Sequence, residues 1–239
     1  MNHISTKEEL NIDGAMIQKS TRLVDRVYEL VKDLIVRNKI APGQVLMENK
    51  LAKSLGISRS PVREALNRLH HEGLVVIEPW KGAVVAPLTA KYVREVYEVR
   101  CALESLAAKK AAPIITDEEI DREERQLEIL RISLEMGDSG PFTESDIPFH
   151  NVFISKCCNE LLCQQIYMLR DHFARIRAFA GTILEHTHES YQEHWDILTA
   201  MRSKDPHLLE RAVRRHLENV CIRLEKAMEK NKNKEKSID

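Results

Sequence analysis

Two groups of residues in this 239-residue chain have types and spacings suited to chemistry. Arg59 and Arg63 are four residues apart, so on an α-helix both guanidinium groups project from one side. An α-helix fits the major groove of DNA, and arginine is the side chain that most often reads guanine there. The second group could hold a divalent metal ion and consists of Asp146, His150, His194 and His216. These residue types fit a DNA reader and a metal centre, whereas the alternative for histidines on helices is an ordinary surface or core position.

The four candidate metal ligands must be brought together by helices. Asp146 and His150 are four residues apart and share a face of one predicted helix, whereas His194 and His216 lie on two later ones. In a helical bundle, three imidazoles and a carboxylate can hold Zn²⁺, with Ni²⁺ or Mn²⁺ as alternatives. The chain has 10 histidines, so another one could replace a member of this set. The available substitutes are His172 and His188.

The two arginines require a helix-turn-helix to present them. Within residues 51–69, regularly spaced Leu, Ile and Val residues predict two helices that pack together. Gly56 lies where the first helix must end and the chain must turn. Ser58 or Ser60 can cap the second helix, and Pro61 is tolerated in its first turn.

Two apolar, β-branched runs follow at 74–78 and 83–86. They flank the sequence Pro-Trp-Lys-Gly at 79–82, which predicts a β-hairpin. A helix, a helix-turn-helix and a hairpin in this order form a winged helix. Gly82 would let the backbone of the wing approach a phosphate or enter the minor groove, and Lys81 would add positive charge there.

Residues 22–88 resemble the DNA-binding domain of GntR-type bacterial transcription regulators. The resemblance rests on Leu-Gly-Ile-Ser-Arg-Ser-Pro-Val-Arg-Glu-Ala-Leu-Asn-Arg-Leu at 55–69, Glu-Gly-Leu-Val at 72–75 and Lys-Gly-Ala-Val-Val at 81–85. It implies that Arg59 and Arg63 read bases and that Gly82 contacts DNA. The chain departs from the family's pattern at Asn49, Trp80 and Lys81.

The rest of the chain is predicted to be helical, with no strand pattern after residue 90. The expected helices cover 89–112, 116–137, 144–157, 159–181, 187–203 and 205–230. Residues 90–225 resemble the all-helical FCD domain, the ligand-binding domain of the FadR branch of the GntR family. This resemblance rests on the sequences at 97–104, 146–150, 193–200 and 212–217.

The FCD resemblance implies roles for five residues. In metal-binding members of the branch, the residues that match the four candidate ligands hold the metal. An arginine that matches Arg100 faces the ligand cavity and pairs with a carboxylate. The other interpretation of Arg100 is an ordinary surface salt bridge with Glu95, Glu98 or Glu104.

The predicted fold class is mostly α. An N-terminal winged helix-turn-helix with a small β-hairpin wing is followed by an all-α antiparallel helical bundle. We expect a mobile arm at 1–19, the DNA-binding domain at 20–88, an effector-binding and dimerisation domain at 89–230 and a disordered tail at 231–239. Residues 20–88 contain 11 Lys and Arg against 7 Asp and Glu, whereas residues 89–239 contain 23 against 27. A basic head on an acidic body suits a DNA reader.

The composition also indicates the cellular compartment in which the protein is expected. No apolar run approaches the roughly 20 residues of a membrane span, so no membrane partner is expected. Residues 1–19 are polar and mixed in charge, unlike a signal peptide. The five cysteines form no CxxC pair, which favours reduced thiols and a cytoplasmic location.

The sequence thus predicts a DNA-binding transcription regulator, a repressor and not an enzyme. A homodimer would bind double-stranded DNA at an inverted repeat, and a small carboxylate effector bound between the metal and Arg100 would control that affinity. The expected DNA contacts are Arg59, Arg63, Ser58, Ser60, Arg68, Lys81 and Gly82. Two alternatives stay open: a structural or sensory metal in the same regulator, and a metal-dependent hydrolase.

Overall fold

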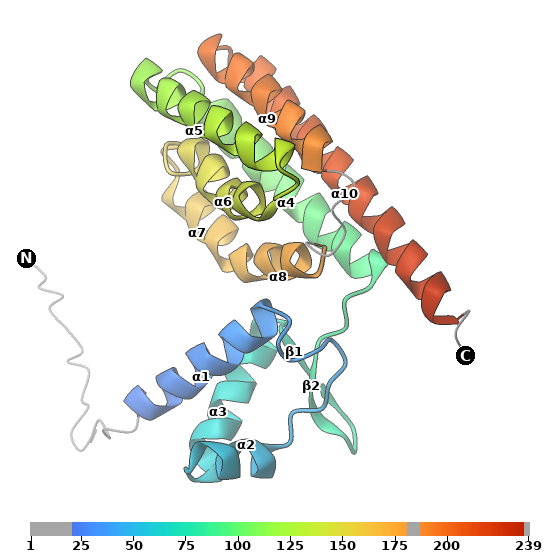
Figure 1. The fold of residues 1–239 in the computed structure, drawn as a ribbon. Coiled ribbons are helices and arrows are strands. Elements are labelled where there is room, and N and C mark those ends of the chain that lie inside the picture. The colour runs from blue at the N-terminus through green and yellow to red at the C-terminus, as the bar shows by residue number, and fades with distance from the viewer. Residues whose placement is uncertain (1–20, 181–186, 237–239) are drawn as a thin grey trace, which may run out of the picture.

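The structure, a computed structural model, describes residues 21–180 and 187–236. The predicted N-terminal arm at 1–19 lies outside the described residues. Two domains follow one another along the chain, and Figure 1 shows the N-terminal one below the helical one. Within the described residues, no helix is both long enough and apolar enough to cross a membrane.

The N-terminal domain is a helix-turn-helix with a wing. Its elements are α1 (Thr21–Val36), α2 (Glu48–Leu55), α3 (Arg59–His71), β1 (Val75–Glu78) and β2 (Gly82–Val85). Buried apolar side chains from α1, α3 and the wing form its core, among them Ile35, Leu69 and Leu74. Gly56 ends α2 with a φ of 66°, a left-handed conformation that favours glycine. The antiparallel pairing of β1 and β2 confirms the predicted hairpin.

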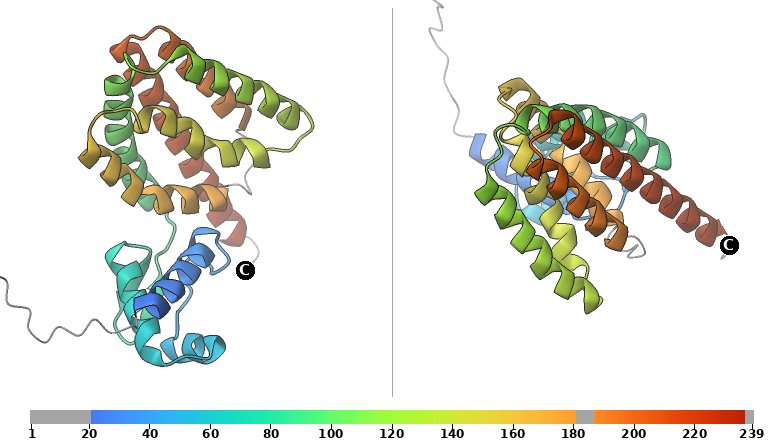
Figure 2. Two further views of the ribbon diagram at one scale, coloured as in Figure 1. Left: turned by 90° about the vertical axis from the view of Figure 1, so that its left-hand side faces the viewer. Right: turned by 90° about the horizontal axis from the view of Figure 1, so that it is seen from above.

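The second domain is an all-helical bundle, as predicted. Its helices are α4 (Ala90–Ala111), α5 (Asp117–Glu135), α6 (Gly140–Ile154), α7 (Glu160–Met168), α8 (Arg170–Ala180), α9 (Thr187–Arg202) and α10 (Pro206–Lys236). The long helices α4 and α10 lie side by side, as the views in Figures 1 and 2 show. Side-chain caps confirm several predicted starts: Thr116 and Glu119 form a capping box, and Asn159 caps α7.

Some predicted helix boundaries were wrong. The single helix expected at 159–181 is two helices, α7 and α8, which are separated at Leu169. No glycine or proline marks this break, so the sequence pattern could not reveal it. Helix α6 begins at Gly140 rather than 144, because Pro141 is accommodated in its first turn. Helix α10 continues to Lys236, so the tail expected from 231 is helical over its first six residues.

Helix α8 contacts both domains. Asp171 forms an ion pair with Lys32 of α1, with 3.2 Å between Oδ2 and Nζ. The backbone oxygen of Arg175 accepts a hydrogen bond of 3.2 Å from the side chain of Asn38. The buried guanidinium group of Arg175 donates a hydrogen bond to the backbone oxygen of Ala86. These contacts place α8 between the winged helix and the rest of the bundle.

Candidate metal centre and DNA-binding face

The helical domain brings the four predicted metal ligands together. Asp146 and His150 come from α6, His194 from α9 and His216 from α10. One ligand atom from each lies within 4.8 Å of the others. The Nε2 atoms of His194, His150 and His216 lie 3.5, 3.7 and 4.0 Å from Oδ1 of Asp146. Two ligands of one zinc ion are separated by roughly 3 to 3.5 Å, because each bond is about 2.0–2.2 Å long.

Buried carboxylates orient two of the imidazoles. Nδ1 of His150 donates to Glu104 at 2.5 Å, and Nδ1 of His216 donates to Glu193 at 2.8 Å. A proton held on Nδ1 leaves the lone pair of Nε2 free for a metal ion. Burial opposes ionisation of the two glutamates. Arg100 beside Glu104 and Arg223 beside Glu193 nevertheless lower the pKa of each carboxyl group to about 2. Both glutamates are therefore ionised and act as acceptors.

All three histidines are neutral at physiological pH. Burial lowers the pKa of His150, lowers that of His216 to about 4 and takes that of His194 well below its usual value. Neutral imidazole is the form that binds metal ions. This protonation state therefore suits a metal centre.

Unpaired buried nitrogen atoms also fit a metal ion. Nε2 of His150 and both ring nitrogens of His194 have no hydrogen-bond partner among the described residues. Buried polar atoms are nearly always paired, so unpaired ones at a converging ligand set point to a bound ion. The two possible substitutes lie elsewhere: His172 contacts Tyr92, and His188 is exposed at the start of α9. The residues present thus fit a divalent cation.

Two arginines flank the cluster, the partly buried Arg177 and the buried Arg100. Arg177 of α8 donates to Oδ2 of Asp146 and, at 3.2 Å, to the backbone oxygen of Thr143. Arg100 is buried rather than part of a surface salt bridge: Nε lies 2.7 Å from Glu104, and Nη2 lies 3.4 Å from Asp146. Its Nη1 faces the hydroxyl of Tyr97 at 3.5 Å. The charge of Arg100 is therefore already compensated by carboxylates of this chain.

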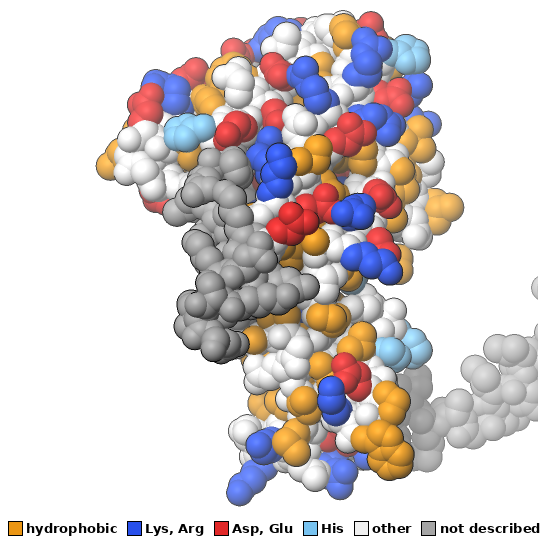
Figure 3. Space-filling model, turned by 90° about the vertical axis from the view of Figure 1, so that its right-hand side faces the viewer, with side chains coloured by type: hydrophobic (Ala, Val, Ile, Leu, Met, Phe, Trp, Pro, Cys, Tyr) orange, Lys and Arg blue, Asp and Glu red, His pale blue; other side chains and the backbone are white. Residues whose placement is uncertain are grey.

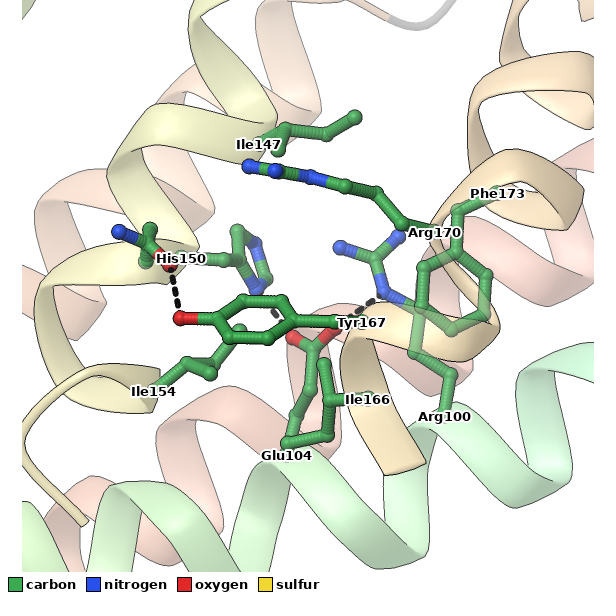
Figure 4. Close-up of a pocket in the computed structure, with 10 residues that line it drawn as sticks. Arg100, Glu104, Ile147, His150, Ile154, Ile166, Tyr167, Arg170 and Phe173 are labelled. Carbon is green, nitrogen blue, oxygen red and sulfur yellow. Dashed lines mark hydrogen bonds and ion pairs between the residues drawn. The ribbon is translucent and has the colours of Figure 1, made fainter. Parts of the chain in front are cut away.

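A small cavity of about 20 Å³ adjoins the cluster. Figure 4 shows Arg100, Glu104 and His150 on its inner side, with Arg170 extending across it toward Ile147. The remaining lining residues are Asn151, Ile154, Ile166, Tyr167 and Phe173. This is room for about one water molecule, so an organic ligand would bind there only if side chains at the rim moved outward.

The recognition helix α3 presents the two predicted base-reading arginines. Arg59 and Arg63 are exposed, and both lie near Glu48 of α2, with Nη2 to Oε2 distances of 3.8 and 3.0 Å. Arg63 makes two further contacts with the same carboxylate through Nε. Exposed pairs of this kind are weak, so DNA can replace Glu48 as the partner. In Figure 3 the lower end of the N-terminal domain carries more basic than acidic side chains.

Two serines of the recognition helix region and two residues of the wing are further predicted DNA contacts. Ser58 occupies the N-cap position of α3, and its side chain makes no capping hydrogen bond. Ser60 lies in the first turn. Gly82 has a φ of 80° at the start of β2, Lys81 pairs with Glu78 at 2.8 Å, and Trp80 is fully exposed at the tip.

Arg68 lies away from the other two arginines of α3, and its predicted contact with DNA stays a prediction. It is nine residues after Arg59, or half a turn around α3. Its guanidinium stacks over the ring of Tyr28 at 3.9 Å and pairs with Asp25 at 2.7 Å. Arg68 thus links α3 to α1, and its charge is engaged within the domain.

Comparison with known protein families agrees with this geometry. The FCD domain family matches residues 95–219, and the family of bacterial regulatory proteins named gntR matches residues 23–85. The chain belongs to the GntR family. It is a repressor-type transcription regulator of that family with a C-terminal FCD domain.

Individual relatives of this GntR regulator support the assignment. The transcriptional repressor RspR of Escherichia coli is 29% identical, covering 86% of this chain and 90% of its own length. The gluconate operon repressor of Bacillus licheniformis is 35% identical over 50% of this chain and 49% of its own. These relatives are regulators and not enzymes, which confirms that prediction. The structure of E. coli McbR/YncC shares the fold, with a TM-score of 0.68, 21% identity and coverage of 89% and 99% of the two chains.

Sequence reasoning missed several residues around the candidate metal centre of the GntR regulator. Glu104, Arg177 and Glu193 contact the predicted ligands from three different helices. The only available signal was spacing: Glu104 is four residues after Arg100, and Glu193 precedes His194. Their partners are 23 to 46 positions away in the chain, so spacing alone could not assign them.

Replacing Glu193 with glutamine should lower metal affinity about 10- to 100-fold, because His216 would lose the carboxylate that orients it. Isothermal titration of the metal-free protein measures this change. Asp196→Asn is the matched control, since Asp196 lies on the same helix and pairs with the exposed Arg215. Equal affinities in the two variants would show that Glu193 does not support metal binding through His216.

Proposed function

We propose that this GntR regulator is a homodimeric repressor whose operator affinity is controlled by a small organic acid bound at a metal ion in the FCD domain. One observation carries the proposal: Asp146 and the Nε2 atoms of three neutral histidines converge beside a cavity that Arg100 also lines. Zn²⁺ suits this ligand set best, with Ni²⁺ or Mn²⁺ as alternatives.

Different residues would hold the metal ion, orient its ligands and bind the acid. Asp146, His150, His194 and His216 would hold the metal ion, and Glu104 and Glu193 would orient two of the imidazoles. A divalent ion held by these four residues would bind a carboxylate oxygen as a further ligand, as when zinc expands to five ligands. Arg100 adds a buried positive charge beside that ligand, although this charge is partly compensated by the ion pair with Glu104.

The winged helix would read the operator. Helix α3 enters the major groove with Arg59 and Arg63 on guanines, while Ser58, Ser60, Lys81 and Gly82 lie near the backbone. A homodimer formed by the helical domains would present two such heads. Two-fold symmetry then requires an inverted-repeat operator.

Helix α8 is the route by which the cavity would influence the head. Phe173 lines the cavity, and Arg177 contacts Asp146. Two residues of the same helix, Asp171 and Arg175, contact the head or the segment that joins it to the bundle. A ligand that shifts α8 would therefore change the position of the head. It can alter DNA affinity only by as much as it prefers one arrangement of the heads over the other.

A thermal-melt screen tests the effector proposal. We expect a small carboxylic acid to raise the melting temperature of the metal-loaded protein by several degrees, and this shift should vanish after chelation. If no acid shifts the melting temperature, the effector proposal is wrong. If chelation alone then lowers the melting temperature, the metal is structural; if it changes DNA binding, the metal is itself the signal.

A further inference from the structure

Among the described residues that line the cavity beside the metal centre, one cation has no carboxylate partner. Arg170, the first residue of α8, is exposed at the rim and forms no ion pair with any described carboxylate. Its guanidinium carbon lies 5.7 Å from the centroid of the Tyr167 ring. Figure 4 shows its side chain reaching from α8 across the cavity toward Ile147 of α6.

The other two arginines near the cavity are already paired. Arg100 contacts Glu104 and Asp146, and Arg177 contacts Asp146. Beyond His216, Glu193 is paired with Arg223 and adds no net charge. Three guanidinium groups therefore face two carboxylates, a net charge of +1 that a divalent metal ion raises to +3. A monocarboxylate would leave two of these charges uncompensated.

The region between the two cationic ends is largely apolar. Ile147, Ile154 and Ile166 line it together with Phe173, and Asn151 and Tyr167 bond to each other at 3.1 Å. A short carbon chain suits such walls, and two anionic ends suit the metal centre and Arg170. The cavity of about 20 Å³ has room for about one water molecule, so the ligand would bind with an outward movement of Arg170, which is exposed at the rim.

We infer that the effector is a short dicarboxylate, with one carboxylate at the metal centre and the other bound by Arg170. This inference rests on the proposed function, because it requires an acid at the metal centre. Arginine binds a carboxylate through two parallel hydrogen bonds, which also sets the orientation of the ligand. Arg170 would thus select dicarboxylates over monocarboxylates of the same length.

Matched pairs of acids test the inference in the metal-loaded, full-length protein. Malate is compared with 2-hydroxybutyrate, and succinate with butyrate, by calorimetric titration and thermal melts. We expect each dicarboxylate to bind about 10- to 100-fold more tightly than its partner. Arg170→Gln should abolish this difference and leave the affinity for monocarboxylates and for the metal unchanged.

The control variant is Arg131→Gln, which removes an exposed arginine on α5 away from the cavity. It should keep the preference for dicarboxylates. Equal binding of both acid classes to the wild type, or a preference that survives Arg170→Gln, would overturn the inference but leave the proposed function intact. No binding of any acid would overturn both.

Discussion

Replacing Arg63 with alanine is expected to weaken operator binding by about 1–3 kcal/mol and to relax base preference at one position of each half-site. Arg63 is exposed on α3, and its present partner is the carboxylate of Glu48 on the surface. Losing this weak pair costs the free protein little, so the effect should appear in DNA binding and not in folding. The affinity is measured by fluorescence anisotropy, with a labelled DNA fragment that has been obtained by selection for binding to the protein.

Arg68→Ala is the matched control for Arg63→Ala. Arg68 belongs to the same helix as Arg63, but it lies on another side of that helix and pairs with Asp25 of α1. This variant should lose some stability and keep the base preference of the wild type. If Arg63→Ala binds with unchanged affinity and preference, α3 does not read DNA as proposed.

Removing the metal ion should produce the second large effect. At a metal concentration 100 times the dissociation constant, binding stabilises the native state by about 2.7 kcal/mol. For a chain of this size that corresponds to a rise in melting temperature of about 5–10 °C. In His194→Ala the difference between metal-loaded and chelated protein should fall close to zero, because one of four ligands is missing.

The comparison must be made within each variant. His194 is fully buried and stacks on Phe149, with 4.2 Å between ring centroids, so its removal lowers stability even without metal. His188→Ala removes an exposed histidine from the same helix and should keep the wild-type response. A metal-dependent rise in His194→Ala equal to that of the wild type would exclude His194 as a ligand.

The winged helix could be predicted in detail because its signals are local. Gly56 ends a helix in a left-handed conformation, and the wing is two β-branched runs around a turn with a glycine. The break between α7 and α8 could not be predicted. Leu169 carries no helix-ending signal, and the apolar spacing continues across it.

The metal centre was predictable as a set of residue types, but its surroundings were not. A sequence shows that Asp146 and His150 share a helical face, because that depends only on the helical period. It cannot show that Glu104 supports His150 or that Arg100 is already paired, since both depend on how α4 packs against α6. The same limit applies to Arg68, whose partner is 43 positions away.

The most direct test of the account is the operator affinity of the full-length protein, measured with and without the stabilising acid, before and after removal of the metal ion. We predict that the acid changes the affinity of the metal-loaded protein by about 5- to 150-fold, the usual range of coupling between sites. It should leave the affinity of the metal-free protein unchanged. The same operator affinity with and without acid in the metal-loaded protein would contradict the account.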